Sequence, residues 1–126
     1  MTRTLRCATG SASWRVIASD GTLHASLADV ATAGKVVYPS LEPGARPASL
    51  LVRAVTSAGT ADGAPFFLAF NYADATLPTD ATAHLVSGSG QTFAQAGGDY
   101  ETAENIWNVW VRNTVAGDLI VLTMRY

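Results

Sequence analysis

The chain carries few side chains whose type and spacing indicate nucleophilic catalysis. Ser89 lies between Gly88 and Gly90, but the outer glycines of the G-x-S-x-G nucleophile motif are absent. Cys7 is the single cysteine, and the two histidines, His24 and His84, are sixty positions apart. A nucleophile needs a base and an orienting group beside it, and the sequence brings no such set together. We therefore expect a protein that is not an enzyme.

Acidic residues supply the remaining candidates for chemistry. Asp99, Glu101 and Glu104 lie in a glycine-rich polar segment and are types used for glycoside cleavage or calcium binding. Their spacing follows no calcium-loop pattern, so we expect solvated loop charges. Gly34-Lys35 is followed by valine, which excludes a phosphate-binding loop of the P-loop type. The sequence predicts no metal and no cofactor.

Aromatic residues suggest binding rather than catalysis. Trp107 and Trp110 fall on opposite faces of a strand predicted over residues 105–112, so only one of them is expected in the core. The other is a candidate interface anchor, because tryptophan is over-represented at binding hot spots. The alternative is a carbohydrate-binding surface in which Trp110 and Tyr100 stack against sugars, with Tyr126 and the acidic segment of Asp99, Glu101 and Glu104 beside them.

Composition limits the classes of partner. The 126 residues are 48% hydrophobic and only 14% charged, with a formal net charge of -2. This balance argues against a general nucleic-acid binder, and no apolar run is long enough for a membrane helix. The first residues lack the apolar stretch of a secretory signal. The low charge fits a surface covered by copies of the chain or by a larger particle, although base composition alone gives a similar bias.

Short apolar segments separated by turn signals predict an all-β fold. We expect a single-domain antiparallel β-sandwich, jelly-roll-like, over residues 13–126, preceded by a short extended N-terminal arm over residues 1–12. The segment 23–33 has apolar residues at helical spacing, but a strand or loop is favoured in an all-β context. The predicted strands cover residues 14–18, 35–38, 49–56, 65–72, 83–87, 91–94, 105–112 and 119–126.

The downstream part of the chain resembles a known class of proteins. The resemblance lies in LLVRAVTSAGTADGAPFFLAFN, GSGQTF and IWNVWVRNTVAGDLIVLTMRY, and it covers about residues 48–126. It is similar in strand and turn pattern to small β-sandwich virion proteins of tailed bacteriophages, including capsid decoration (cement) proteins. The resemblance implies a non-enzymatic role on the capsid surface after synthesis in the host cytoplasm.

The implied partners are the major capsid protein or other virion proteins, with the chain itself a homo-oligomer, most often a trimer. Neither nucleic acid nor membrane is an expected partner. Two alternatives stay open, namely a tail, neck or fibre-associated virion protein and a carbohydrate-binding module. If the resemblance holds, two arginines of the arm pair with acidic capsid groups and three residues of the closing hairpin face a neighbour; these are Arg3, Arg6, Trp110, Arg112 and Arg125.

Overall fold

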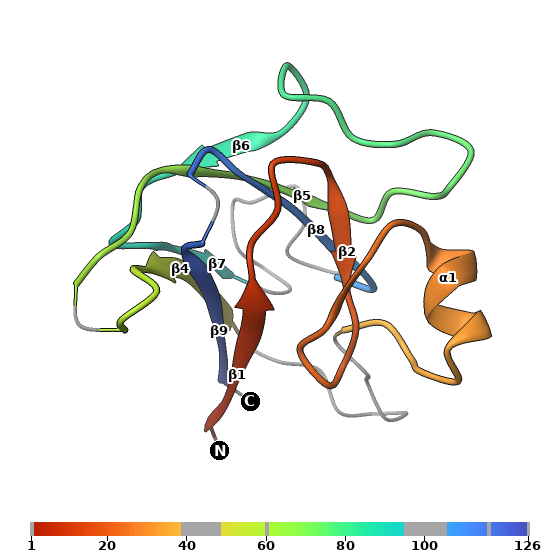
Figure 1. The fold of residues 1–126 in the computed structure, drawn as a ribbon, viewed down its shortest axis with the longest axis horizontal. Coiled ribbons are helices and arrows are strands. Elements are labelled where there is room, and N and C mark those ends of the chain that lie inside the picture. The colour runs from red at the N-terminus through yellow and green to blue at the C-terminus, as the bar shows by residue number, and fades with distance from the viewer. Residues whose placement is uncertain (1, 39–48, 60, 95–105, 116, 126) are drawn as a thin grey trace.

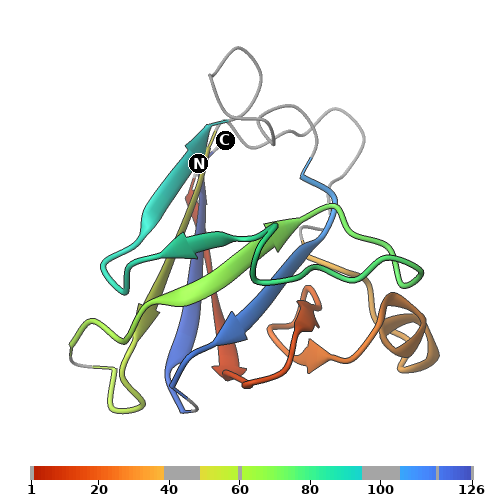
Figure 2. The same ribbon diagram turned by 90° about the horizontal axis from the view of Figure 1, so that it is seen from above.

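A computed structural model describes residues 2–38, 49–59, 61–94, 106–115 and 117–125. These residues form two antiparallel sheets packed as a β-sandwich, with one short helix beside them (Figures 1 and 2). The four-stranded sheet has the order β1 (Thr2–Thr9), β9 (Leu119–Arg125), β4 (Ser49–Val55) and β7 (Gln91–Ala94). The five-stranded sheet has the order β3 (Leu23–His24), β2 (Arg15–Ile17), β8 (Val109–Asn113), β5 (Phe66–Phe70) and β6 (His84–Val86).

The strand order is that of a jelly roll. When the two-residue strand β3 is set aside, the sheets read β1-β9-β4-β7 and β2-β8-β5-β6. The first strand therefore pairs with the last, and the chain crosses between the sheets as two Greek keys do. The predicted antiparallel, jelly-roll-like sandwich is confirmed.

The core lies between the inner faces of the two sheets. In β4 and β9 the alternate residues are buried and lie opposite one another, for example Val52 against Leu122 and Leu50 against Met124. The five-stranded sheet contributes Phe66, Leu68, Phe70, Val109 and Val111 from its own inner face. Period-two alternation thus buries one face of each sheet, which supplies most of the hydrophobic stabilisation.

The N-terminal residues differ from their predicted conformation. Residues 2–9 form β1, whose register with β9 sets Leu5 opposite Leu122, and Leu5 packs against the core. The expectation that residues 1–12 lie outside the sandwich as an arm is therefore wrong. The segment has little strand pattern of its own, and the ladder along β9 determines its conformation.

The segment predicted as strand or loop over residues 23–33 contains a helix, α1 (Leu27–Thr32), together with the short strand β3. Ser26 caps α1, since its hydroxyl oxygen accepts a hydrogen bond of 3.0 Å from the Asp29 amide. Val30 is the buried residue of this six-residue helix. The apolar spacing in this segment correctly indicated a helix, and favouring a strand or loop because of the all-β context was wrong.

Two further predicted strands differ in extent. Val37 makes only an isolated bridge to Ala18, so residues 35–38 are not a strand. The strand predicted over 105–112 begins at Val109, which leaves Trp107 before it. No helix formed by the described residues is long and apolar enough to cross a membrane.

Candidate functional site

The middle of the outer face of the five-stranded sheet is covered by other parts of the chain, whereas Leu85 of β6, at the edge of this face, is exposed. Val16, Trp110 and Ala69 lie in register across β2, β8 and β5 and form what we call the covered face. Val30 of α1 is buried in the same cluster, and Tyr72 and Ala83 from the ends of the β5–β6 connection pack against it. Figure 1 shows this connection and α1 on the same side of the molecule.

Trp110 is a packing residue of the covered face. Its side chain is 0% exposed, and its indole Nε1 donates a hydrogen bond of 3.3 Å to the Tyr72 carbonyl oxygen. The prediction that Trp110 faces a neighbouring protein is therefore wrong. A buried tryptophan satisfies its N–H in this way because an unpaired donor in the interior is costly.

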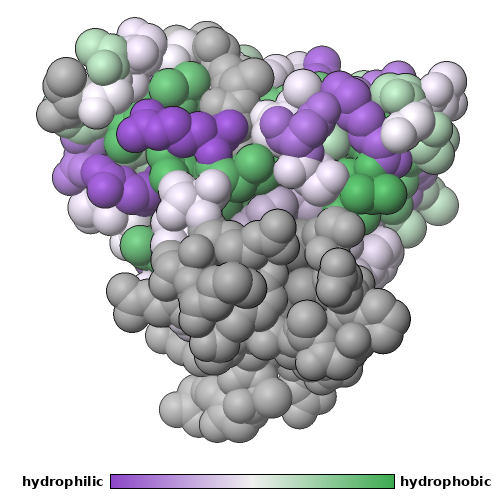
Figure 3. Space-filling view, turned by 90° about the horizontal axis from the view of Figure 1, so that it is seen from below, coloured by the Kyte–Doolittle hydropathy of each residue, from purple (hydrophilic) through white to green (hydrophobic). Residues whose placement is uncertain are grey.

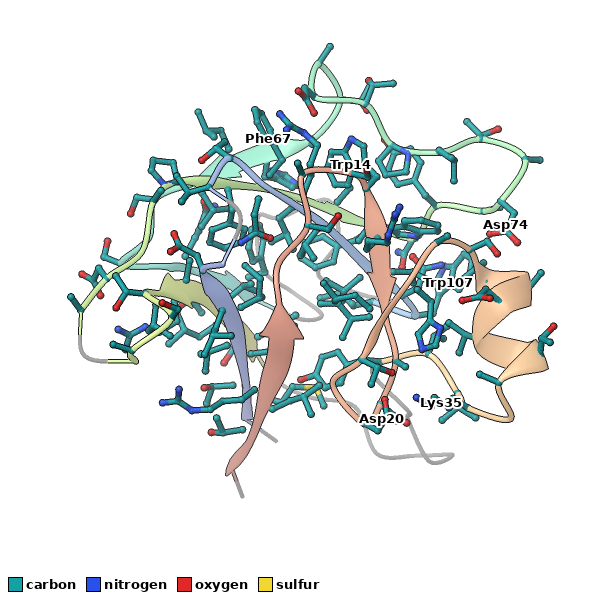
Figure 4. All side chains as sticks on the ribbon, viewed as in Figure 1. Trp14, Asp20, Lys35, Phe67, Asp74 and Trp107 are labelled. Atoms are coloured by element: carbon teal, nitrogen blue, oxygen red, sulfur yellow. The ribbon has the colours of Figure 1, made fainter. Side chains whose placement is uncertain are left out.

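Two asparagines fix the start of the connection that covers this face, at residues 71 and 72. Asn108 is fully buried, accepts from the Tyr72 amide at 3.1 Å and donates to the Tyr72 carbonyl at 2.8 Å. Asn71, with a positive φ of 63°, accepts from the Trp107 amide at 2.9 Å. Trp107 itself is 47% exposed, and in the view of Figure 4 it is drawn between β2 and α1. Of the two tryptophans, Trp107 is the one at the surface.

Asp74 ties the connection to the helix. Its carboxylate accepts from the Leu27 amide at 2.7 Å and from the Ala28 amide at 3.0 Å. Both amides belong to the first turn of α1, where intrahelical acceptors are missing. Figure 4 shows Asp74 at this end of α1. The cover of the five-stranded sheet is thus held together by side chains from distant parts of the sequence.

Arg112 is engaged within the chain. Its guanidinium donates two hydrogen bonds to the Asp80 carboxylate, at 2.9 and 2.7 Å, and lies 4.7 Å from the ring centroid of Phe67. Trp14 extends this group, with its ring 6.5 Å from that of Phe67 (Figure 4). A bidentate ion pair and a cation–π contact use the guanidinium on both its edge and its face. The expectation that Arg112 faces a neighbour finds no support in these contacts.

A network of polar side chains joins the β2–β3 turn to α1. His24 lies between Asp29 and Thr22, with Nδ1 2.8 Å from the Asp29 carboxylate and Nε2 2.8 Å from the Thr22 hydroxyl. The Thr22 hydroxyl also donates to Asp20 at 2.6 Å, and Lys35 pairs with Asp20 at 3.0 Å (Figure 4). The Thr22 hydrogen bond and the Lys35 ammonium hold the pKa of Asp20 well below its usual range.

This network resembles an acid–base relay in outline only. The Thr22 hydroxyl proton is committed to Asp20, and Lys35 donates to the Thr22 oxygen at 3.1 Å. The group's hydrogen bonds connect the turn, β3 and α1, so its evident role is to hold these elements together. Within the described ranges, no three histidine, cysteine or acidic side chains lie close enough to hold a metal ion.

The outer face of the four-stranded sheet differs in composition. Two rows cross it in register, one running from Thr4 through Thr123 to Leu51 and the other from Arg6 through Val121 to Arg53. Except for Val121, these side chains are exposed or half-buried. We call this surface the open face; its residues are Thr4, Arg6, Leu51, Arg53, Thr92 and Thr123.

The open face has no cover among the described helices and strands (Figures 1 and 2). On the described part of the underside, Figure 3 shows hydrophilic and hydrophobic side chains interleaved. Arg53 pairs with Asp62 at 2.9 Å. Arg6 is exposed and has no carboxylate partner among the residues that the structure describes. The face therefore combines threonine, leucine and Arg6, a cation that no described carboxylate pairs with.

The other predicted interface residues lie partly outside the described side chains. Arg3 is a residue of β1 opposite Met124, and Arg125 is a residue of β9 opposite Thr2 and Ser49, but only their backbone is described. Tyr100, Tyr126 and the acidic residues Asp99, Glu101 and Glu104 lie outside the described residues. Sequence reasoning missed the threonine row, although polar residues alternating with Leu122 and Met124 in β9 marked an exposed face.

No family model, curated protein or solved structure matches this chain. The two outer faces of the sandwich therefore have to be interpreted from their own geometry and chemistry.

Proposed function

We propose that the protein is a non-enzymatic virion structural protein, most simply a capsid decoration protein that binds and stabilises the capsid lattice of a tailed phage. The partner is the major capsid protein or another virion protein, and the chain acts as a homo-oligomer, a trimer, on the capsid surface. Jelly-roll domains are frequent in virus particles, but they also serve as lectins and cupins, so the fold alone does not decide the function.

The observation that carries the proposal is the open face. Its rows of Thr4, Thr123 and Leu51 are apolar enough to gain from burial and polar enough to remain soluble before docking. Arg6 adds a positive charge that an acidic partner surface would complement. A modest interface of this kind becomes effective when many copies bind one particle, because the contacts add through multivalency.

Several of the described side chains able to do chemistry support a structural role. His24, Thr22 and Asp20 are occupied by one another, and the carboxylates of Asp74 and Asp80 bind the first turn of α1 and Arg112. Each of these contacts fastens one part of the fold to another. An active site, by contrast, needs polar groups held ready for a substrate.

A carbohydrate-binding module is the second candidate, and Trp107 is the observation that favours it. Trp110, predicted to stack against sugars in this alternative, is buried, whereas Trp107 is 47% exposed and its backbone amide donates to Asn71. A glycan panel tests this candidate through tryptophan fluorescence. A spectral change that is absent in Trp107→Ala supports sugar binding, and an unchanged spectrum with every glycan opposes it.

The direct test of the virion proposal is sedimentation of a native lysate in which the protein is made, followed by mass spectrometry of the heaviest fractions. Migration in many copies with a particle in the megadalton range is the expected result. A tail, neck or fibre location would give the same co-migration with a low copy number per particle. Recovery only as a free small species at the top of the gradient would overturn the proposal.

A further inference from the structure

The four strands that end the two sheets differ greatly in length. β3, β6 and β7 have two, three and four residues, whereas β1 has eight. Proteins usually keep edge strands short or covered, because a long edge offers its backbone N–H and C=O groups to another strand. β1 is therefore the exceptional edge of this molecule.

Part of this edge is already closed. Gly21, which has a φ of 89°, lies so near β1 that a methyl group on it would be 2.6 Å from the Arg6 carbonyl oxygen. The β2–β3 turn thus covers the edge at Arg6, and the register with β9 is irregular between Arg6 and Thr9. The regular part of the edge that remains is Thr2–Leu5.

The position of Gly21 also shows which backbone groups face outward. The Arg6 carbonyl points to Gly21 and hence away from β9. In an antiparallel strand the hydrogen-bonding direction alternates from residue to residue. Thr4 and Thr2 therefore direct their N–H and C=O groups away from β9, as Arg6 does. No strand of the described residues pairs with β1 on this side.

We infer that the Thr2–Leu5 edge binds an extended, acidic segment of a partner protein as an additional strand of the four-stranded sheet. Backbone pairing supplies affinity in this mode of recognition, and alternate side chains supply specificity. The acidic character follows from Arg6, which is exposed on the adjacent open face and pairs with no carboxylate of the described residues. Three other cations of the chain each pair with an aspartate, namely Lys35, Arg53 and Arg112.

The inference goes beyond the proposed function, because it concerns the way in which a partner binds. It applies whether or not that partner is a capsid protein. The probe is a capped peptide of alternating threonine and glutamate, compared with the same peptide carrying lysine in place of glutamate. Binding is followed by NMR on the full chain, with hydrogen exchange of the Thr2 and Thr4 amides as the site-specific readout. We expect the acidic peptide to bind more tightly and to slow exchange at both amides.

Two variants at one position separate backbone pairing from side-chain contact. Thr4→Pro removes an N–H that the β1–β9 ladder does not use, and proline is accepted at sheet edges in this orientation. Thr4→Val keeps the N–H and the branched shape. We expect Thr4→Pro to weaken peptide binding about tenfold and Thr4→Val to change it by less than about twofold. Arg6→Glu is expected to reverse the preference between the acidic and the basic peptide.

A second probe covers the case in which Thr4→Pro disturbs the fold. An N-methylated version of the acidic peptide has the same charge but cannot donate backbone hydrogen bonds, and it should not bind the unmodified protein. Equal binding of this peptide, or the absence of amide protection with every peptide, would overturn the inference. Amide protection that depends on protein concentration without any peptide would assign the edge to a second copy and overturn the acidic partner. Failure of the protein to sediment with a particle leaves this result unaffected.

Discussion

The outer faces of the two sheets differ in whether other parts of the chain cover them. On the covered face, Trp110 and Val16 are large or branched apolar residues, and α1 with the β5–β6 connection shields them from water. On the open face, Thr4 and Thr123 occupy equivalent outward positions without any described cover. A sheet face that is covered from within is part of the fold, whereas a face left open is available to a partner.

The choice of residues explains why the open face is tolerated in solution. Threonine has the branched shape that suits a strand, and its hydroxyl keeps the surface hydrated. The Thr4 and Thr123 hydroxyls lie 3.5 Å apart across the β1–β9 pair. A row of this kind can remain exposed before docking and still pack closely against another protein afterward.

The largest expected difference between the faces concerns stability. Trp110→Ala should lower the free energy of unfolding by about 3–5 kcal/mol, because it leaves a cavity under the cover. Thr123→Ala, the matched change on the open face, should cost less than about 1 kcal/mol. Urea unfolding followed by circular dichroism measures both. Similar losses for the two variants would show that the open face is also part of the packed interior.

The contact between the β5–β6 connection and α1 can be weakened without changing the sheets. Asp74→Ala removes the acceptor of two amides in the first turn of α1 and should cost about 1 kcal/mol. Hydrogen exchange at Leu27 and Ala28 should accelerate, while exchange in β9 stays slow. Thr76→Ala, at an exposed position of the same connection, is the control and should alter neither. Unchanged exchange at Leu27 in Asp74→Ala would contradict this role of Asp74.

Arg112 and Arg6 are expected to differ in their contributions to stability. Arg112→Ala should lower the free energy of unfolding by about 1 kcal/mol, because an ion pair and a ring contact are lost together. Arg6→Ala should change stability by less than about 0.5 kcal/mol, since Arg6 is exposed on the open face. Thermal unfolding of both variants is the measurement. A larger loss for Arg6→Ala would mean that Arg6 is committed within the fold.

The smallest expected effect lies in the response to acid. Because the pKa of Asp20 is held below its ordinary value of 3.8, the unfolded chain takes up a proton there before the folded chain does. This contribution to stability is complete above about pH 5 and is lost as the pH falls further. Asp20→Asn should therefore lower the melting temperature at pH 7 and flatten its decline between pH 5 and 2. Parallel declines in the two proteins would contradict the assignment.

The sequence predicted the sheets better than their surroundings. Alternation in segments such as 49–55 and 119–125, with turn signals between them, was sufficient for an antiparallel sandwich. β1 was missed because Leu5 is the only large apolar residue in its sequence and because its pairing with β9 joins opposite ends of the chain. α1 was missed because the all-β context was given more weight than the helical spacing of Leu27 and Val30, and because Asp74, which binds its first turn, comes from a distant part of the sequence.

The candidate site was predicted only in part, for related reasons. One of Trp107 and Trp110 was correctly expected outside the core, but Trp107 precedes β8, which begins at Val109, so the predicted alternation along one strand does not apply to it. The partner of Arg112 is Asp80, which no local pattern reveals. Arg6, predicted to lie in an arm and to pair with acidic capsid groups, lies in β1 and is exposed, and its pairing with a capsid stays a prediction.

We propose that the partner binds the open face and not the covered face. The most direct test is sedimentation of a native lysate containing wild-type protein, Thr123→Glu or Leu85→Glu, each first shown to be folded. Thr123 lies on the open face, and Leu85 is an exposed residue of β6 in the other sheet. We expect Thr123→Glu to leave the particle fraction and Leu85→Glu to remain with it. Loss of Leu85→Glu with retention of Thr123→Glu, or retention of both, would contradict it.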